Sequence, residues 1–167
     1  MSKSPRSPHA LSWLWLSLLL IGLDQASKFW VLEHFQPYQV HPVIPGVFNL
    51  ILAFNTGAAF SFLAGAGGWQ RWLFTVIAVG VSLVLAYSLY RTPQGAWRTA
   101  LPFALIIGGA LGNVIDRWRA GQVTDFIQIH WRQWYFPTFN LADSAITVGA
   151  VLLIVFALFP GKPTGSA

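Results

Sequence analysis

Four long apolar stretches limit what this chain can fold into. They cover about residues 11–32, 69–90, 98–115 and 141–159. A helix needs about 20 residues to cross the hydrocarbon core of a bilayer, and each stretch is close to that length. Only 9% of the residues are charged, whereas about a quarter are charged in a water-soluble domain. We therefore expect an all-α membrane protein, a single domain over residues 1–167 with four transmembrane helices.

The first stretch contains charged residues. Its purely apolar part, residues 11–23, is too short to cross a bilayer, so the span must include Asp24, Gln25 and Lys28. Asp24 and Lys28 are four positions apart and share a helix face. They form an ion pair within the helix, or Asp24 faces a polar site, since ionisable residues at membrane depth usually line one.

Two long connections join these helices. In residues 33–68, prolines interrupt any helix, and then residues 47–54 are typical of a strand, 55–57 of a turn and 58–63 of a second strand. An open sheet edge cannot face lipid tails, so we expect a small β-hairpin or sheet element outside the hydrocarbon. The connection 117–139 is rich in aromatic rings, which favour the headgroup level.

Four spans put both termini on one side of the membrane and both connections on the other. Lys and Arg divide evenly between the two sides, so the positive-inside rule does not decide the orientation. All five acidic side chains fall on the side of the connections, where most basic residues have an acid or a helix end nearby. We therefore expect cytoplasmic termini and periplasmic connections.

The composition excludes several kinds of site. The chain has no cysteine, so disulfides, zinc thiolates and a cysteine nucleophile are impossible. The four histidines show no metal-ligand spacing. The net charge of +5 comes from basic residues that form no stripe, so anionic lipid headgroups are a better partner than nucleic acid.

Polar side chains gather at the connection end of the predicted bundle. They are Asp24, Asn55, Asn113, Asp116, Arg117, Asp125, Asn140 and Asp143. Some of them also have a purely structural explanation. Asn140 and Asp143 could serve merely as a helix cap, and Asp116 and Arg117 merely as a structural ion pair. Residues 55–57 could be merely a turn. Asp125 has no such alternative, because Val123-Thr124-Asp125-Phe126 contains no cap pattern and no adjacent Lys or Arg.

Five sequence blocks combine these residues between positions 24 and 143. They are Asp24-Gln25-x-x-Lys28, Asn55-Thr56-Gly57-Ala58-Ala59-Phe60-Ser61, Gly108-Gly109-x-x-Gly112-Asn113-x-x-Asp116-Arg117, Val123-x-Asp125-Phe126 and Phe139-Asn140-x-Ala142-Asp143. In this order they resemble the five blocks of bacterial lipoprotein signal peptidase, signal peptidase II. Each block alone is a weak signal, and the set is highly specific. The resemblance implies a four-helix aspartyl endopeptidase of the inner membrane with its active site at the periplasmic face.

The resemblance also implies roles for residues. It places the catalytic dyad on Asp125 and Asp143. It places substrate binding or support of the site on Asp24, Lys28, Asn55, Gly57, Asn113, Asp116, Arg117 and Asn140. The implied substrates are prolipoproteins already lipidated with diacylglyceryl on the Cys that becomes the new N-terminus, and globomycin is the implied inhibitor. We expect a monomer that contacts membrane lipids and uses no cofactor and no metal.

The chemistry of two carboxylates agrees with a peptidase. Amide hydrolysis without Cys or metal needs an activated water, and two carboxyl groups that share a proton supply a base and an acid. Two alternatives remain open. One is a phospholipid transferase that binds Mg²⁺ through Asp116, Asp125 and Asp143, although no two of these share a helix face. The other is a transporter or channel subunit with Asp24 and Asp143 in a proton path, although the other half of the bundle is apolar.

Overall fold

The computed structural model describes residues 9–56 and 68–159. Within these ranges, four helices are long and apolar enough to cross a membrane. They are α1 (Leu14–His34), preceded by the 3-10 turn η1 (Ala10–Trp13), then α2 (Gln70–Arg91), α3 (Trp97–Ala120) and α4 (Leu141–Leu158). The four predicted helices are therefore present.

The third helix is longer than its apolar pattern predicts. We expected it to end at residue 115, before Asp116 and the connection 117–139, but α3 continues to Ala120 and ends at Gly121 in the left-handed conformation (φ 73°). Asp116 is 8% exposed. The prediction was wrong because these polar side chains find partners inside the protein and do not need solvent.

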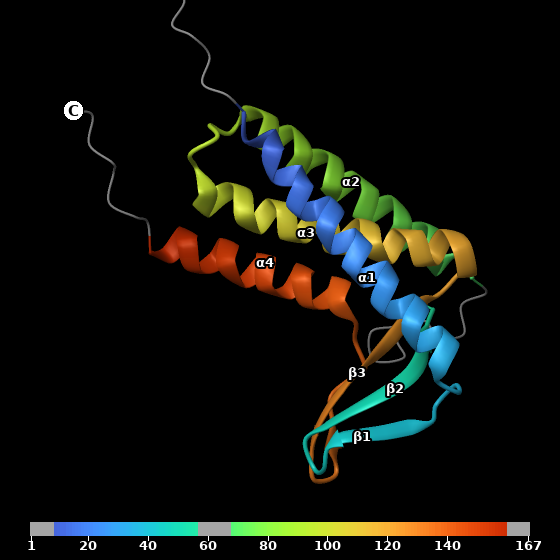
Figure 1. The fold of residues 1–167 in the computed structure, drawn as a ribbon. Helices are drawn as coiled ribbons and strands as arrows, with labels where there is room; N and C mark the ends of the chain where they lie inside the picture. Colours follow the sequence, from blue (N-terminus) through green and yellow to red (C-terminus); the bar gives the residue numbers. More distant parts are fainter. Residues whose placement is uncertain (1–8, 57–67, 160–167) are drawn as a thin grey trace, which may run out of the picture.

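The central helix of the bundle is α3, which packs against α1, α2 and α4 (Figure 1). Its glycines permit this close packing. A Cβ atom on Gly109 would collide with the carbonyl oxygen of Ala142 in α4, and one on Gly112 would lie 2.7 Å from Oδ2 of Asp24 in α1. These contacts bring the ends of three helices together around Asp24.

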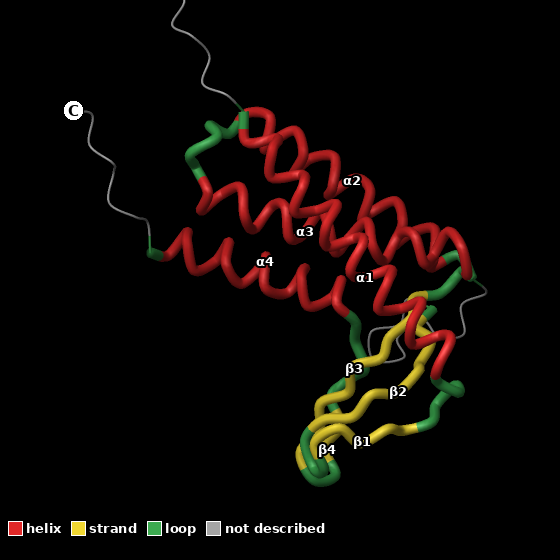
Figure 2. The backbone as a smooth tube through the Cα atoms, in the orientation of Figure 1, coloured by secondary structure: helices red, strands yellow, loops and turns green. Residues whose placement is uncertain are grey.

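A four-stranded antiparallel sheet lies at one end of the bundle (Figure 2). The strands run in the order β1 (Val40–Ile44), β2 (Phe48–Asn55), β3 (Val123–Trp131) and β4 (Trp134–Tyr135). The strand predicted at 47–54 is confirmed as β2, and the strand predicted at 58–63 lies outside the described residues. The sheet element is larger than predicted, because β3 and β4 come from the connection in which we expected only interfacial aromatics.

The sheet is tied to the bundle by a small core and by hydrogen bonds. Val31 of α1 packs with Leu52 of β2 and Phe126 of β3. The carbonyl oxygen of Phe139 accepts hydrogen bonds from the backbone N–H groups of Phe126 (3.0 Å) and Ile127 (2.8 Å). The start of α4 is therefore held beside β3, which is what brings residue 125 close to residue 143.

The opposite end of the bundle carries the other helix ends. Ala10 donates a backbone hydrogen bond to the carbonyl oxygen of Thr92 (3.0 Å), and the Arg98 side chain donates one to that of Phe159. The start of the first helix, the turn between α2 and α3, and the end of α4 therefore lie together, away from the sheet (Figure 1).

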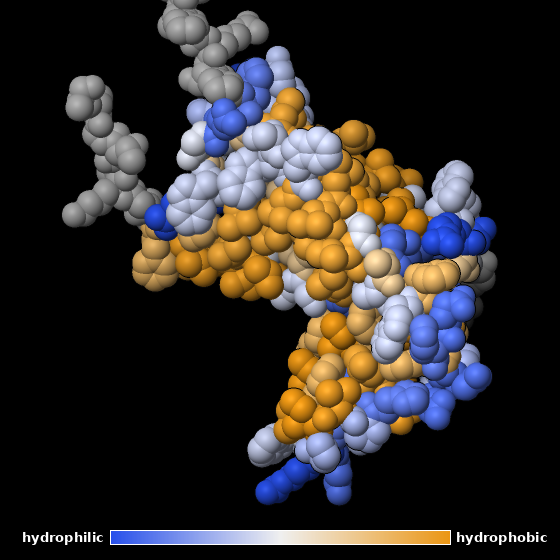
Figure 3. Space-filling model, in the orientation of Figure 1, coloured by the Kyte–Doolittle hydropathy of each residue, from blue (hydrophilic) through white to orange (hydrophobic). Residues whose placement is uncertain are grey.

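Apolar side chains cover the outer faces of the helices and part of the sheet (Figure 3). Val76 and Leu83 of α2 and Ile154 of α4 each expose 60% or more of their surface. So much contiguous apolar surface is far more than a soluble monomer presents. The outer faces of the helices are therefore suited to lipid.

Candidate active site

Asp125 and Asp143 meet through a single side chain, Asn140. Asp125 lies on β3 and Asp143 in the first turn of α4. The Asn140 amide nitrogen donates a hydrogen bond of 2.7 Å to Asp125 Oδ1, and its amide oxygen accepts one of 2.9 Å from the backbone N–H of Asp143. The two carboxyl groups that the sequence predicts as a pair are thus brought to one place.

The same contacts form a capping box at the start of α4. The backbone N–H of Asn140 donates to Asp143 Oδ2 (3.3 Å), which reciprocates the bond from Asp143 to the Asn140 side chain. Asn140 is fully buried and Asp125 is 1% exposed. The cap explanation is therefore correct, but it is incomplete, because the capping side chain also holds Asp125.

The surroundings of Asp125 make it a weak acid. Burial raises the pKa of its carboxyl group to about 7, and the nearby charge of Asp143 acts in the same direction. Hydrogen bonds from Asn55 and Asn140 and the charge of Lys28 partly oppose this shift. Near neutral pH, Asp125 is therefore able to hold or release a proton.

Asp143 is held by Asn113 of α3. The amide nitrogen of Asn113 donates to Asp143 Oδ1 at 2.7 Å. The amide oxygen of Asn113 accepts from Lys28 Nζ (3.0 Å) and from the Asn140 amide (3.2 Å). Since an ammonium group can only donate, the amide oxygen of Asn113 must face Lys28, and its amide nitrogen then faces Asp143.

Lys28 is also the centre of a buried charge cluster, which we define as Asp24, Lys28 and Asp116. Its ammonium nitrogen lies 2.8 Å from Asp24 Oδ2 and 2.8 Å from Asp116 Oδ2. The same ammonium group donates a hydrogen bond to the Asn113 amide oxygen (3.0 Å). The ion pair predicted within α1 is thus present, and it faces the polar site as well, so both explanations hold.

The two acids of the cluster have further roles in packing. Asp24 Oδ1 accepts from the backbone N–H of Ala142 (3.0 Å), which ties the N-terminus of α4 to α1. Asp116 accepts from the Gln25 side chain (2.9 Å) and from the backbone N–H of Thr124 (3.2 Å). The ion pair of Asp116 is therefore with Lys28, and the sequence neighbour Arg117 is not needed for it.

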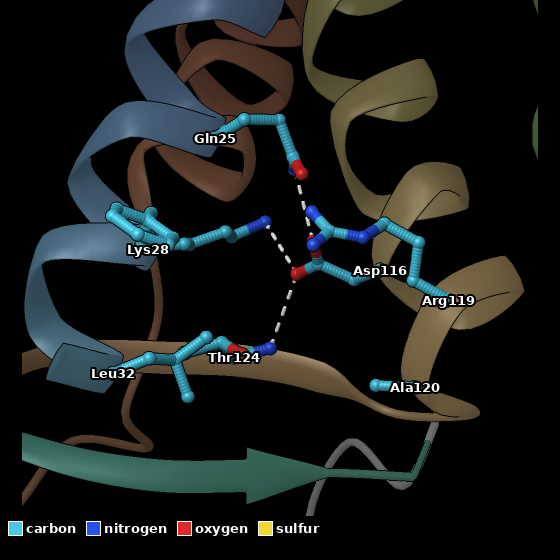
Figure 4. Close-up of a pocket in the computed structure, with 8 residues that line it drawn as sticks. Gln25, Lys28, Leu32, Asp116, Arg119, Ala120 and Thr124 are labelled. Atoms are coloured by element: carbon cyan, nitrogen blue, oxygen red, sulfur yellow. Dashed lines mark hydrogen bonds and ion pairs between the residues drawn. The ribbon is translucent and has the colours of Figure 1, made fainter.

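A pocket of about 190 Å³ opens beside this cluster (Figure 4). Figure 4 shows Gln25 and Lys28 reaching from one helix toward Asp116 on another, with Thr124 below them. Gln25 lies within a sequence block that we quoted but was not predicted as a site residue. Its position three residues before Lys28, on the same helix face, was the available signal.

Arg117 and Asn55 complete the surroundings of the dyad. The Arg117 guanidinium donates weakly to the carbonyl oxygen of Asn113 (3.4 Å) and lies over the ring of Phe74. It is close enough to interact with the charges of Asp143, Asp116 and Asp125. Asn55 bonds to Asp125, so its role exceeds that of a turn residue. Gly57 lies outside the described residues.

The magnesium alternative needs Asp116 beside the other two acids. In the structure, both oxygens of Asp116 face donors, namely Lys28, Gln25 and the Thr124 backbone. No group of three His, Asp or Glu side chains within residues 9–56 and 68–159 has the geometry of a metal site. The arrangement of acids thus favours a two-carboxylate site.

A mostly apolar groove of about 350 Å³ is lined in part by Asp143. Its lining includes Phe136, Pro137 and Phe139, which precede α4, and Thr147 and Val148 of α4. Val148 is half exposed on the outer face of α4. The groove therefore connects the surface suited to lipid with one member of the carboxyl pair.

Comparison with known proteins gives a consistent result. The family model described as signal peptidase (SPase) II matches residues 16–159. The lipoprotein signal peptidase of Xanthomonas campestris is 54% identical over 167 residues, covering 100% of this chain and 99% of that protein. That of Xylella fastidiosa is 54% identical over 158 residues, covering 95% of both.

Solved structures agree with the sequence comparison. A bacterial membrane enzyme determined by the in meso method at 2.3 Å resolution has a TM-score of 0.80 and 26% identity, and 99% of each chain is covered. A second such structure, at 1.9 Å resolution, has a TM-score of 0.78. The resemblance found in five short blocks therefore extends over the whole chain, and this chain belongs to the signal peptidase II family of peptidases.

Proposed function

We propose that this chain is an aspartyl endopeptidase of the bacterial inner membrane. It removes the signal peptide from diacylglyceryl-modified prolipoproteins by cutting before the lipidated Cys. The observation that carries the proposal is the Asp125–Asn140–Asp143 arrangement, in which two buried or half-buried carboxyl groups share one positioning side chain. The supporting residues are Asp24, Lys28, Asn55, Gly57, Asn113, Asp116, Arg117 and Asn140.

The groove beside Asp143 supports a lipidated substrate. Its lining is mostly apolar and includes Val148, which is half exposed on α4. Acyl chains on the substrate can therefore stay among lipids while the peptide bond next to the modified Cys approaches the dyad. A soluble peptide would gain nothing from such an approach.

We further propose that both termini are cytoplasmic and that the sheet and the dyad lie at the periplasmic face. All five acids lie near the sheet end of the bundle in sequence, and Lys28 neutralises part of that charge. A prolipoprotein reaches this face with its signal peptide still in the membrane. The chain acts as a monomer, and a globomycin-type cyclic peptide blocks the site.

The direct test is incubation of the purified protein with a lipidated prolipoprotein, followed by mass spectrometry. We expect one cut before the modified Cys, complete inhibition by globomycin and no effect of EDTA. Asp125→Asn and Asp143→Asn should each nearly abolish cleavage, while Asp24→Asn should lose less. Near-normal cleavage by either dyad variant, or loss of wild-type activity in EDTA, would refute an aspartyl mechanism.

A further inference from the structure

The two carboxyl groups of the dyad have different surroundings. Asp143 has a donor on each oxygen: the Asn113 amide on Oδ1 (2.7 Å) and the backbone N–H of Asn140 on Oδ2 (3.3 Å). It also lies in the first turn of α4, where the helix dipole stabilises negative charge. Asp143 therefore faces a hydrogen-bond donor with each oxygen, at the N-terminus of a helix.

Asp125 accepts hydrogen bonds from the Asn140 and Asn55 side chains but lies at no helix N-terminus. It lies on a strand, is 1% exposed and has no helix terminus beneath it. Burial of a carboxylate without a paired cation is costly, and Lys28 already contacts Asp24 and Asp116 directly. The hydrogen bonds from Asn140 and Asn55 do not offset burial, which together with the charge of Asp143 raises the pKa of Asp125 to about 7.

The charged groups around the dyad balance one another. Lys28 of α1 and Arg117 of α3 carry positive charge, and Asp24 of α1 and Asp116 of α3 carry negative charge. The hydrogen-bond partners of the dyad on β2 and α4, Asn55 and Asn140, are neutral. Since the surroundings add no net charge, a second negative charge on the dyad is uncompensated and one proton stays on the pair.

The orientation of the Asn140 amide determines which carboxyl group faces a donor from this side chain. Its amide oxygen must face the N–H of Asp143, because the helix cap requires an acceptor there. Its amide nitrogen therefore faces Asp125, where the 2.7 Å bond is the shortest of its three contacts. Lys28 orients Asn113 in the same way, so that its amide nitrogen faces Asp143.

From this geometry we infer that the proton of the dyad resides on Asp125, that Asp143 is the base that activates water, and that Asn140 is the positioning residue that fixes this order. The inference rests on the proposed function. In the first step, Asp143 takes a proton from water as its oxygen attacks the carbonyl carbon, and Asp125 gives its proton to the carbonyl oxygen. In the second, Asp143 returns its proton to the leaving amine as the C–N bond breaks, and Asp125 takes one from the hydroxyl group as the acid product forms.

Infrared spectroscopy tests this order without substrate. A protonated carboxyl group has a C=O stretch separate from that of a carboxylate, and this chain has only five acidic side chains. The wild-type protein in a detergent without carbonyl or carboxyl groups should show one such band that disappears as the pH rises through about 7. Asp125→Asn should lack this band. Asp143→Asn should keep it with a lower midpoint, because the neighbouring charge no longer raises the pKa of Asp125.

Glu33→Gln is the matched control, because Glu33 is an exposed acid at the end of α1. It should retain both the wild-type band and its midpoint. The inference is wrong if the wild type shows no protonated band, if the band persists in Asp125→Asn, or if it is lost in Asp143→Asn. Since no substrate is present, these outcomes are independent of whether prolipoprotein is cleaved.

Asn140→Asp tests the positioning role. Asp caps a helix about as well as Asn, so α4 keeps its cap, while the three contacts of the buried Asn140 amide nitrogen are lost and thermal stability should fall. The new side chain faces Asp125 with an acceptor in place of a donor, and the midpoint of the Asp125 band should shift upward by more than one pH unit. An unchanged midpoint would show that Asn140 acts only as a cap.

Discussion

Lys28→Met tests whether the ammonium group holds the buried charge cluster together. Lys28 and Asp24 are almost fully buried, and Asp116 is 8% exposed. Met keeps the length of the side chain and removes the charge, which leaves two acids without their common partner. Removal of one partner from a buried ion pair costs about 3–5 kcal/mol. For a protein of this size, each kcal/mol lowers Tm by about 2–4 °C, so we expect a decrease of about 6–20 °C.

The assay is thermal unfolding in detergent micelles, followed by loss of helical circular dichroism. Arg119→Met is the matched control, because Arg119 is an exposed cation beside the same pocket. Its effect should stay within about 0.5 kcal/mol, as is usual for surface substitutions. A triple variant with Asp24→Asn and Asp116→Asn added to Lys28→Met should recover more than half of the loss, since it leaves no unpaired buried charge.

Two results would refute this reasoning. One is a Tm of Lys28→Met within about 2 °C of wild type, which would mean that the cluster adds little to stability. The other is a triple variant as unstable as the single one, which would mean that packing of the lysine stem matters more than its charge. Cleavage activity is measured in parallel, because loss of Lys28 also removes the donor that orients Asn113.

Further substitutions test other parts of the site. Gly112→Ala should lower stability by about 1–3 kcal/mol, because its Cβ would lie 2.7 Å from Asp24. Gly22→Ala is the control and should not lower stability, because the space around its Cβ is open. Equal melting temperatures of the two variants would contradict the helix packing described above. Cleavage should fall as pH rises through about 7, where Asp125 loses its proton. Asn55→Ala should move this fall in activity to higher pH, because it removes a hydrogen bond that lowers the pKa of Asp125. An unchanged pH profile would contradict the contact between Asn55 and Asp125. Arg117→Ala should reduce turnover, and full activity would exclude a role for Arg117 at the site. Reporter fusions after Thr92 and after Gln133 should give opposite signals, and a cytoplasmic signal after Gln133 would overturn the proposed orientation.

The helices could be predicted from the sequence because a bilayer demands a particular length of apolar residues, and few other structures satisfy it. The end of α3 could not, because Asp116 looks like a residue that has left the helix. Its partners Lys28 and Gln25 come from a helix more than eighty residues away in sequence. No local pattern records such a contact.

The sheet was only partly predictable for a related reason. β2 has a clear strand pattern, but its partner β3 is separated from it in sequence by two transmembrane helices. The two strands pair with Ala53 opposite Asp125 and Asn55 opposite Val123. The aromatic residues around β3 suggested a position relative to the membrane and gave no register. The pairing matters for the proposed site, because it places Asn55 within reach of Asp125.

The dyad itself shows why a short motif can support two explanations at once. Asn140 and Asp143 have the spacing of a helix cap, and a cap is sufficient reason for both residues. The cap requires the amide oxygen of Asn140 to face the backbone N–H of Asp143. The amide nitrogen of Asn140 therefore points the other way, toward Asp125 on β3. The helix cap, a local element, therefore determines that Asp125 faces a hydrogen-bond donor, although only folding brings Asp125 near the cap. Asn140→Asp keeps the acceptor that caps α4 and removes the donor that faces Asp125, so the midpoint of the Asp125 band reports the second role directly.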